Sequence, residues 1–189
     1  MLTIGMRLPA KLSACALAVC AFTAPSRAHA SEIQFGAYDV PTTFYISKSD
    51  DKNRVDYGMR LDSSCAPVGS DAVFPYWREF EKAPPVRTHD ISFFEKVPYG
   101  VADQKVLRRN SDGVDYAILL KQLNRIIYIT TKKQADGKCF ALVRSNINGV
   151  LSQLDYVYAK LAGFASVDYI DVFGKNMTTG AAVSERIKK

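Results

Sequence analysis

Alternation of apolar and polar residues along short segments is the feature that most restricts the fold of this chain. Between Arg54 and Asp62, every second residue from Val55 to Leu61 is apolar, and the residues between them are charged or glycine. The preceding segment, Thr42–Lys48, has the same alternation. A period of two places successive side chains on opposite faces of an extended strand, so these segments predict antiparallel strands with one buried face. The charged run SDDKN between them predicts a turn.

Similar segments recur along the chain at the spacing expected of an all-β sandwich or barrel. Turn-forming sequences such as SDG, ADGK and NMTTG separate them. The sequence therefore predicts an all-β fold, a single-domain antiparallel β-sandwich or barrel with about nine or ten strands. The further predicted strands are VFPYW, VADQKVLRR, VDYAILL, RIIYITTKK, KCFALVRSN, VDYIDVFGK and AAVSERI.

One segment, at 151–162, fits two structures. Leu151, Leu161 and two apolar residues between them lie at helical spacing, but a Tyr-Val-Tyr run within the segment favours a strand. We predict a strand from Leu154 to Ala162, and a helix remains the alternative.

A short peripheral helix is predicted near the middle of the chain. The pair Pro84-Pro85 cannot join a strand ladder. After it, Ser92 and Glu95 have the spacing of a capping box, and Pro98 is expected to end the helix.

The first thirty residues have the features of an export signal. Arg7 and Lys11 precede the apolar run LSACALAVCAFTA, which ends before the small-x-small site Ala28-His29-Ala30. We predict cleavage between Ala30 and Ser31, a β-rich domain over residues 31–189, and a periplasmic or secreted location. The apolar run is shorter than the roughly 20 residues of a membrane span, so no membrane span is expected.

Lipidation is the alternative processing of this segment. Cys15 follows Lys11 before an apolar stretch has accumulated, and Cys20 follows Val19 where a small residue is preferred. Both cysteines are therefore interpreted as apolar signal residues.

The charge of the mature chain is ordinary. Arg7, Lys11 and Arg27 leave with the signal, so the 25 basic residues become 22 against 19 acidic ones. The basic pairs lie far apart in the sequence, whereas nucleic-acid binding requires clustered positive charge. Nucleic acid is not an expected partner.

Cys65 and Cys139 are the two cysteines left after signal removal. An even pair in an exported protein predicts a disulfide. The alternative, a nucleophilic cysteine served by His89, lacks a helix N-terminus or cationic setting that would lower the thiol pKa.

Most catalytic motifs are absent from the mature sequence. It contains no Gly-rich phosphate loop, no GxSxG elbow, no HExxH and no CxxC, and it has one histidine, His89. We predict no cofactor and no metal site. Asp50, Asp51 and Asn53 lack the ligand spacing of a calcium loop.

Aromatic residues beside basic ones are the most informative positive feature. Such pairs suit sugars, peptides or anionic envelope components, although they also suit tyrosines at the rim of a β core. We predict a ligand-contacting face comprising Lys48, Asn53, Arg60, Tyr76 and Trp77.

Several segments together resemble a known family. FYISKSDDKNRVDYGMRLD, PVGSDAVFPYW, VPYG and VDYIDVFGKNMTTGAAVSERI are similar to the bacterial exported domain of unknown function numbered 4833, over Phe44 to Ile187. The chain has Lys48 where the family pattern prefers Arg, and Asp51 where it prefers Asn. A bidentate contact made by such an arginine would be poorly replaced by lysine. The resemblance implies no established activity.

The leading functional hypothesis is an exported non-enzymatic domain that binds a ligand or partner in the cell envelope. An envelope glycan hydrolase acting through a carboxylate pair, such as Glu79 with Glu81, is the alternative. A structural component of an envelope assembly is a third hypothesis. The sequence does not identify the ligand, and the oligomeric state stays open.

Overall fold

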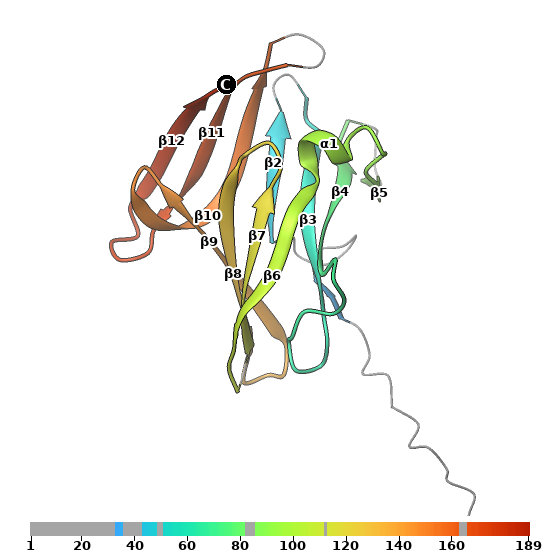
Figure 1. Cartoon of the computed structure of the whole chain (residues 1–189), viewed down its shortest axis with the longest axis vertical. Coiled ribbons are helices and arrows are strands. Elements are labelled where there is room, and N and C mark those ends of the chain that lie inside the picture. Colours follow the sequence, from blue (N-terminus) through green and yellow to red (C-terminus); the bar gives the residue numbers. More distant parts are fainter. Residues whose placement is uncertain (1–32, 36–42, 49–50, 82–85, 112, 163–165) are drawn as a thin grey trace, which may run out of the picture.

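The computed structural model describes residues 33–35, 43–48, 51–81, 86–111, 113–162 and 166–189, and the predicted signal peptide lies outside them. The all-β prediction is confirmed (Figure 1). The elements are β1 (Ile33–Phe35), β2 (Phe44–Lys48), β3 (Arg54–Leu61), β4 (Val73–Glu79), β5 (Arg87–Asp90), α1 (Lys96–Tyr99), β6 (Val101–Arg109), β7 (Gly113–Leu120), β8 (Arg125–Lys133), β9 (Cys139–Ile147), β10 (Val150–Leu161), β11 (Val167–Asn176) and β12 (Ala182–Lys188).

The strands form one sheet that folds over at β10. The hydrogen-bonded order is β5-β4-β3-β2-β10-β9-β8-β7-β6, with β1 beside β3 and with β11 and β12 continuing from β10. Residues Val150–Gln153 of β10 pair with β9, and Tyr156–Ala159 pair with β2. The two halves of the sheet therefore face each other (Figure 1).

Two details of the topology differ from the sequence prediction. The pairing of β10 with β2 is parallel, while the other ladders are antiparallel. Among the described residues, no ladder joins β6 to β4 or β5, so the sheet does not close into a barrel. The architecture is an open, folded mixed sheet.

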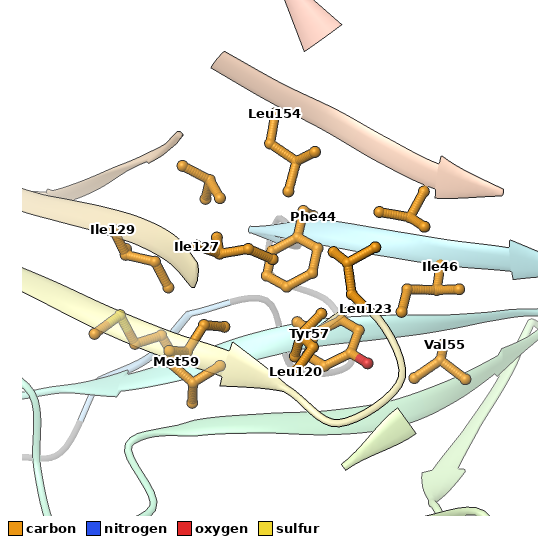
Figure 2. Close-up of a cluster of buried hydrophobic side chains, with 14 of the residues drawn as sticks. Phe44, Ile46, Val55, Tyr57, Met59, Leu120, Leu123, Ile127, Ile129 and Leu154 are labelled. Atoms are coloured by element: carbon orange, nitrogen blue, oxygen red, sulfur yellow. The ribbon is translucent and has the colours of Figure 1, made fainter. Parts of the chain in front are cut away.

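The core fills the space between the two halves. Phe44 of β2 stacks on Tyr57 of β3, with ring centroids 4.4 Å apart. Both rings are fully buried, as are Ile127 and Ile129 of β8 (Figure 2). Their burial on one face of each strand is what the alternating sequence pattern predicts.

A β-bulge explains the ambiguous segment 151–162. The strand prediction is confirmed, although β10 begins earlier, at Val150. The pairing with β11 shifts register between Leu154 and Tyr156, which adds one residue to the strand. The buried side chains therefore change from even to odd positions after Leu154, with Val157 next.

The predicted capping box forms, but the helix begins later than expected. The backbone N–H of Ser92 donates to Glu95 Oε2 at 2.6 Å, and the N–H of Glu95 faces Ser92 Oγ at 3.4 Å. Pro98 lies inside α1 rather than ending it, which the first turn of a helix tolerates. The segment Arg87–Asp90, where no strand was predicted, forms the short edge strand β5.

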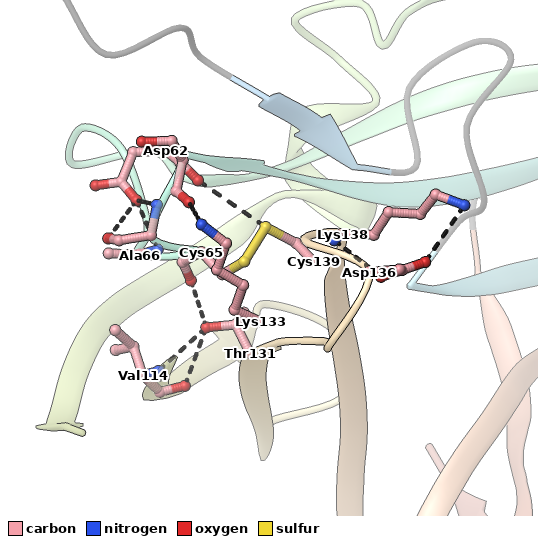
Figure 3. The surroundings of a disulfide bond; sticks show 11 residues. Asp62, Cys65, Ala66, Val114, Thr131, Lys133, Asp136, Lys138 and Cys139 are labelled. Carbon is pink, nitrogen blue, oxygen red and sulfur yellow. Dashed lines mark hydrogen bonds and ion pairs between the residues drawn. A yellow bond between two sulfur atoms is a disulfide. The ribbon is translucent and has the colours of Figure 1, made fainter. Parts of the chain in front are cut away.

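The predicted disulfide is present at the end of the sheet opposite α1. Cys65 in the β3–β4 loop is bonded to Cys139 at the start of β9, with Cα atoms 5.5 Å apart (Figure 3). Cys65 has a positive φ of 64°, unusual for a residue with a side chain. The Asp62 carboxylate accepts hydrogen bonds from the backbone N–H groups of Ser64 and Ala66, the two neighbours of Cys65. These bonds hold the turn that carries Cys65.

None of the helices within the described ranges has the length and hydrophobicity that crossing a membrane requires.

Candidate ligand-binding cavity

An apolar cavity of about 610 Å³ opens at the end of the folded sheet where α1 lies. Its walls come from the ends of β2, β4, β10 and β11, from the β7–β8 turn, and from α1 with the residues just before it. Most of its lining is apolar. The lining residues are Ile46, Lys48, Trp77, Phe94, Glu95, Val97, Pro98, Tyr99, Leu120, Gln122, Leu123, Val157, Ala159, Leu161, Val167 and Ile170.

Three hydrogen bonds hold α1 and its flanking residues over the cavity. The indole Nε1 of Trp77 donates to Glu95 Oε1 at 2.7 Å. The hydroxyl of the buried Tyr57 donates to the carbonyl of Tyr99 at 2.7 Å, and Lys121 N–H donates to the carbonyl of Gly100 at 3.2 Å. The helix is therefore tied to both halves of the sheet.

Glu95 is a structural carboxylate at the rim of the cavity. Burial alone would raise the pKa of Glu95, but hydrogen bonds from Ser92 and Trp77 outweigh it, so the pKa lies below its ordinary value. Both carboxylate oxygens accept hydrogen bonds. Glu95 is thus suited to positioning α1 and the Trp77 ring, not to holding a proton.

Lys48 supplies a cation in this apolar setting. Its ammonium group lies 4.9 Å from the centroid of the Trp77 ring and 2.9 Å from Asp51 Oδ2. The ring of Tyr99 meets Trp77 edge-on at 5.8 Å. Burial raises the pKa of the Tyr99 hydroxyl, which Lys48 partly offsets. At neutral pH the cavity therefore combines an uncharged phenol and a lysine with apolar walls.

The five residues of the predicted contact face do not lie together. Lys48 and Trp77 line the cavity. Tyr76, which alternates with Trp77 on β4, is buried on the other side of the sheet. Arg60 lies over the Phe74 ring at 4.4 Å, outside the cavity lining.

Asn53 has a structural role. Its Oδ1 accepts hydrogen bonds from the backbone N–H groups of Phe80 and Glu81, at 2.8 and 3.3 Å. It therefore connects the turn before β3 to the end of β4.

The outer face of the sheet contains a buried carboxylate that the sequence pattern did not reveal. Asp56 is fully buried and lies 2.6 Å from Arg54 Nε and 2.8 Å from Arg78 Nε. Arg54 in turn covers the Tyr45 ring at 4.1 Å, and Tyr45 stacks on Tyr156 at 5.3 Å. The aromatic and basic residues of this face pack mainly against one another, which favours a structural role.

The carboxylates considered for hydrolysis lie elsewhere. Glu79 Oε1 is 3.4 Å from His89 Nε2, and Glu81 is exposed. Neither residue belongs to the cavity lining. No group of three or more His, Cys, Asp and Glu side chains placed to hold a metal was found in the described part of the chain.

A family model matches residues 44–186, and the chain therefore belongs to the family described as Domain of unknown function (DUF4833). The resemblance seen in the sequence is confirmed by this match. No curated protein and no solved structure matches the chain.

Proposed function

We propose that this member of the family binds a small amphiphilic molecule, an acyl chain with an anionic head group, in the cavity under α1. The observation that carries the proposal is the apolar cavity of about 610 Å³ with Lys48 among its lining residues. Small-molecule sites have volumes of roughly 300–1,000 Å³, with mainly apolar walls and a few polar groups that fix orientation.

The apolar part of the ligand would lie against the ends of β10 and β11. Val157, Ala159 and Leu161 face the cavity from β10, and Val167 and Ile170 face it from β11. An acyl chain in this position gains the hydrophobic free energy of leaving water.

The head group would lie near Lys48. Its side chain is about a quarter exposed, at 27%. A charge that is only partly hydrated attracts an anion more strongly than one in bulk water. An anionic head group would compete for the Lys48 ammonium with Asp51, whose Oδ2 lies 2.9 Å from Lys48 Nζ.

An exported location fits this function. The proposed signal over residues 1–30 would send the chain to the periplasm or out of the cell, and the Cys65–Cys139 disulfide is of the kind that persists in oxidising compartments. Acyl ligands with acidic head groups are available there from the envelope lipids.

Trp77 provides a direct test because it is the one tryptophan of the chain and lines the cavity. Titration of the purified protein with dodecanoate should change the Trp77 emission saturably, with a matching heat of binding in calorimetry. Ala159→Phe, which places a ring in the cavity, should weaken binding roughly tenfold, equivalent to about 1.4 kcal/mol.

The matched control is Ala102→Phe, which adds the same ring on the exposed outer side of β6. It should leave the affinity unchanged. Thermal unfolding of both variants separates a blocked cavity from a misfolded protein. An unchanged Trp77 emission together with no heat of binding up to the solubility of dodecanoate would refute the proposed function.

A further inference from the structure

Three apolar side chains project at the mouth of the cavity. Phe93 and Phe94 are 80% and 82% exposed, the highest values among the large hydrophobic residues in the described ranges, and Val97 is 58% exposed. Phe94 and Val97 also line the cavity. We call Phe93, Phe94 and Val97 the apolar tip, and it is continuous with the cavity lining.

The backbone around the tip is anchored at both ends. Ile91 is buried before it, and the Tyr99 carbonyl accepts the Tyr57 hydroxyl after it. Between these points, the Ser92–Glu95 capping box fixes the turn that carries both phenylalanines. The two rings meet edge-on at 5.9 Å. The exposure of the tip is therefore built into the local structure.

Positive charge flanks the tip. Lys96 belongs to α1 itself, and Lys121 enters from the β7–β8 turn beside Gly100, the residue that follows α1. Both lysines border a second, more polar hollow of about 370 Å³ next to the cavity. Arg60, Asp71 and Asp90 border the same hollow, so three basic and two acidic residues meet there. Exposed apolar side chains with lysines beside them are a combination that binds a bilayer with anionic lipids, since rings enter the interface while ammonium groups meet phosphates.

We propose that the apolar tip docks on an anionic phospholipid bilayer and that the cavity takes its acyl ligand there. The inference rests on the proposed function for the identity of the ligand. The continuity of the tip with the cavity lining, together with the adjacent Lys96 and Lys121, favours a bilayer with anionic lipids as the partner of this face.

Vesicle sedimentation tests the docking directly. The full processed protein should sediment with vesicles of phosphatidylglycerol and phosphatidylcholine, and much less with phosphatidylcholine alone. Phe93→Ser with Phe94→Ser should weaken the partitioning roughly tenfold or more. Lys96→Gln and Lys121→Gln should each weaken it about fivefold, and the effect should shrink as salt is raised.

The matched control lies at the other end of the sheet, where exposed Phe140 pairs with exposed Lys132 across β9 and β8. Phe140→Ser with Lys132→Gln should leave sedimentation unchanged. Equal sedimentation of the tip variant and the parent protein would overturn the inference. So would a concentration-dependent dimer that the tip substitutions dissociate, because that outcome assigns the tip to a second copy.

The cavity-blocked variant Ala159→Phe separates this inference from the proposed function. It should bind dodecanoate roughly tenfold more weakly and keep vesicle binding, since Ala159 is buried within the cavity wall. Vesicle binding without any dodecanoate binding by the parent protein would refute the cavity function alone. Dodecanoate binding without vesicle binding would refute the docking alone.

Discussion

The side-chain amide of Gln104 pairs with both backbone groups of Val73. Gln104 Oε1 accepts the Val73 N–H at 3.0 Å, and Gln104 Nε2 faces the Val73 carbonyl at 3.4 Å. Val73 begins β4 and Gln104 lies in β6, so one side chain takes the place of a ladder hydrogen-bond pair across the open seam of the sheet. The Tyr116 hydroxyl donates to the same Oε1 at 2.9 Å and holds the amide in place.

Replacing Gln104 should therefore open this seam. Gln104→Ala removes the partner of the Val73 N–H, and a backbone group left unpaired in a buried setting costs about 1–3 kcal/mol. We expect a lower free energy of unfolding in urea and faster amide exchange at Val73. Lys105→Ala, at the neighbouring exposed position of β6, should change neither quantity. Equal effects of the two substitutions would contradict this role of Gln104.

Replacing the buried Asp56 should strongly lower the free energy of unfolding. Asp56→Asn leaves Arg54 and Arg78 without their shared carboxylate. Breaking a buried ion pair costs about 3–5 kcal/mol, and we expect the lower end of that range because the two arginine side chains are 26% and 20% exposed. The measurement is the urea midpoint at neutral pH.

The control for Asp56 is a similar pair at the surface. Asp171 accepts hydrogen bonds from Arg186, whose side chain is 54% exposed. Asp171→Asn should cost less than about 1 kcal/mol, as exposed ion pairs do. A larger loss for Asp171→Asn than for Asp56→Asn would show that burial does not decide the contribution of these pairs.

The disulfide should contribute a large part of the stability. A sequence separation of 74 residues between Cys65 and Cys139 corresponds to about 4.5 kcal/mol in the chain-entropy model. Dithiothreitol should therefore lower the urea midpoint of the parent protein markedly. The double variant Cys65→Ser, Cys139→Ser should have the low midpoint with or without the reductant. A parent midpoint that dithiothreitol leaves unchanged, despite confirmed reduction, would contradict the prediction.

Glu185 should make stability depend on pH. A hydrogen bond from Arg125 holds the pKa of Glu185 below its ordinary value, with burial opposing and the Asn148 N–H adding to the effect. Because its pKa is lower in the folded state, ionised Glu185 stabilises the fold at pH values above the unfolded-state pKa of roughly 4.3. This contribution is lost as the pH falls through the lower pKa of the folded state. Glu185→Gln should cost about 1 kcal/mol at neutral pH, and the difference should disappear in acid. Unfolding curves at several pH values measure this.

Glu81→Gln, at an exposed carboxylate, is the control for this pH dependence. It should follow the parent protein at each pH. A Glu185→Gln curve parallel to that of the parent protein from neutral to acid would contradict the prediction.

The strands were predictable because their pattern is local. From Val101 onward each predicted strand forms. Alternation records a buried face in β8 and β11, whereas β6 and β12 contain no buried residue. β5 was missed because Pro84-Pro85 dominated the interpretation of its surroundings. The parallel pairing of β10 with β2 joins residues more than a hundred positions apart, as at Tyr156 and Tyr45, and no local pattern encodes such a partner.

The cavity was only partly predictable, for a related reason. Trp77 and Lys48 were predicted as contact residues from the sequence. Lys48 lies two residues after the buried Ile46, so both side chains are on the inner face of β2 and both line the cavity. Alternation also put Asp56 on a solvated face, although aromatic and arginine side chains from neighbouring strands bury it. Which side chains cover a face depends on strands that are distant in the sequence.

Lys48 should determine which head group the cavity accepts. Its ammonium group lies over the Trp77 ring and beside Asp51, so removing it leaves the Asp51 carboxylate without this cation at the rim of the cavity. Lys48→Met should weaken dodecanoate binding roughly tenfold, as expected for losing a partly buried ion pair with the ligand. The same substitution should leave dodecyltrimethylammonium binding unchanged or strengthen it, because the repulsion between two cations disappears. Lys52→Met, at an exposed position in the same turn, is the control and should affect neither ligand. Calorimetry with the two ligands measures the ratio of affinities, and an unchanged ratio in Lys48→Met would place the head group elsewhere in the cavity.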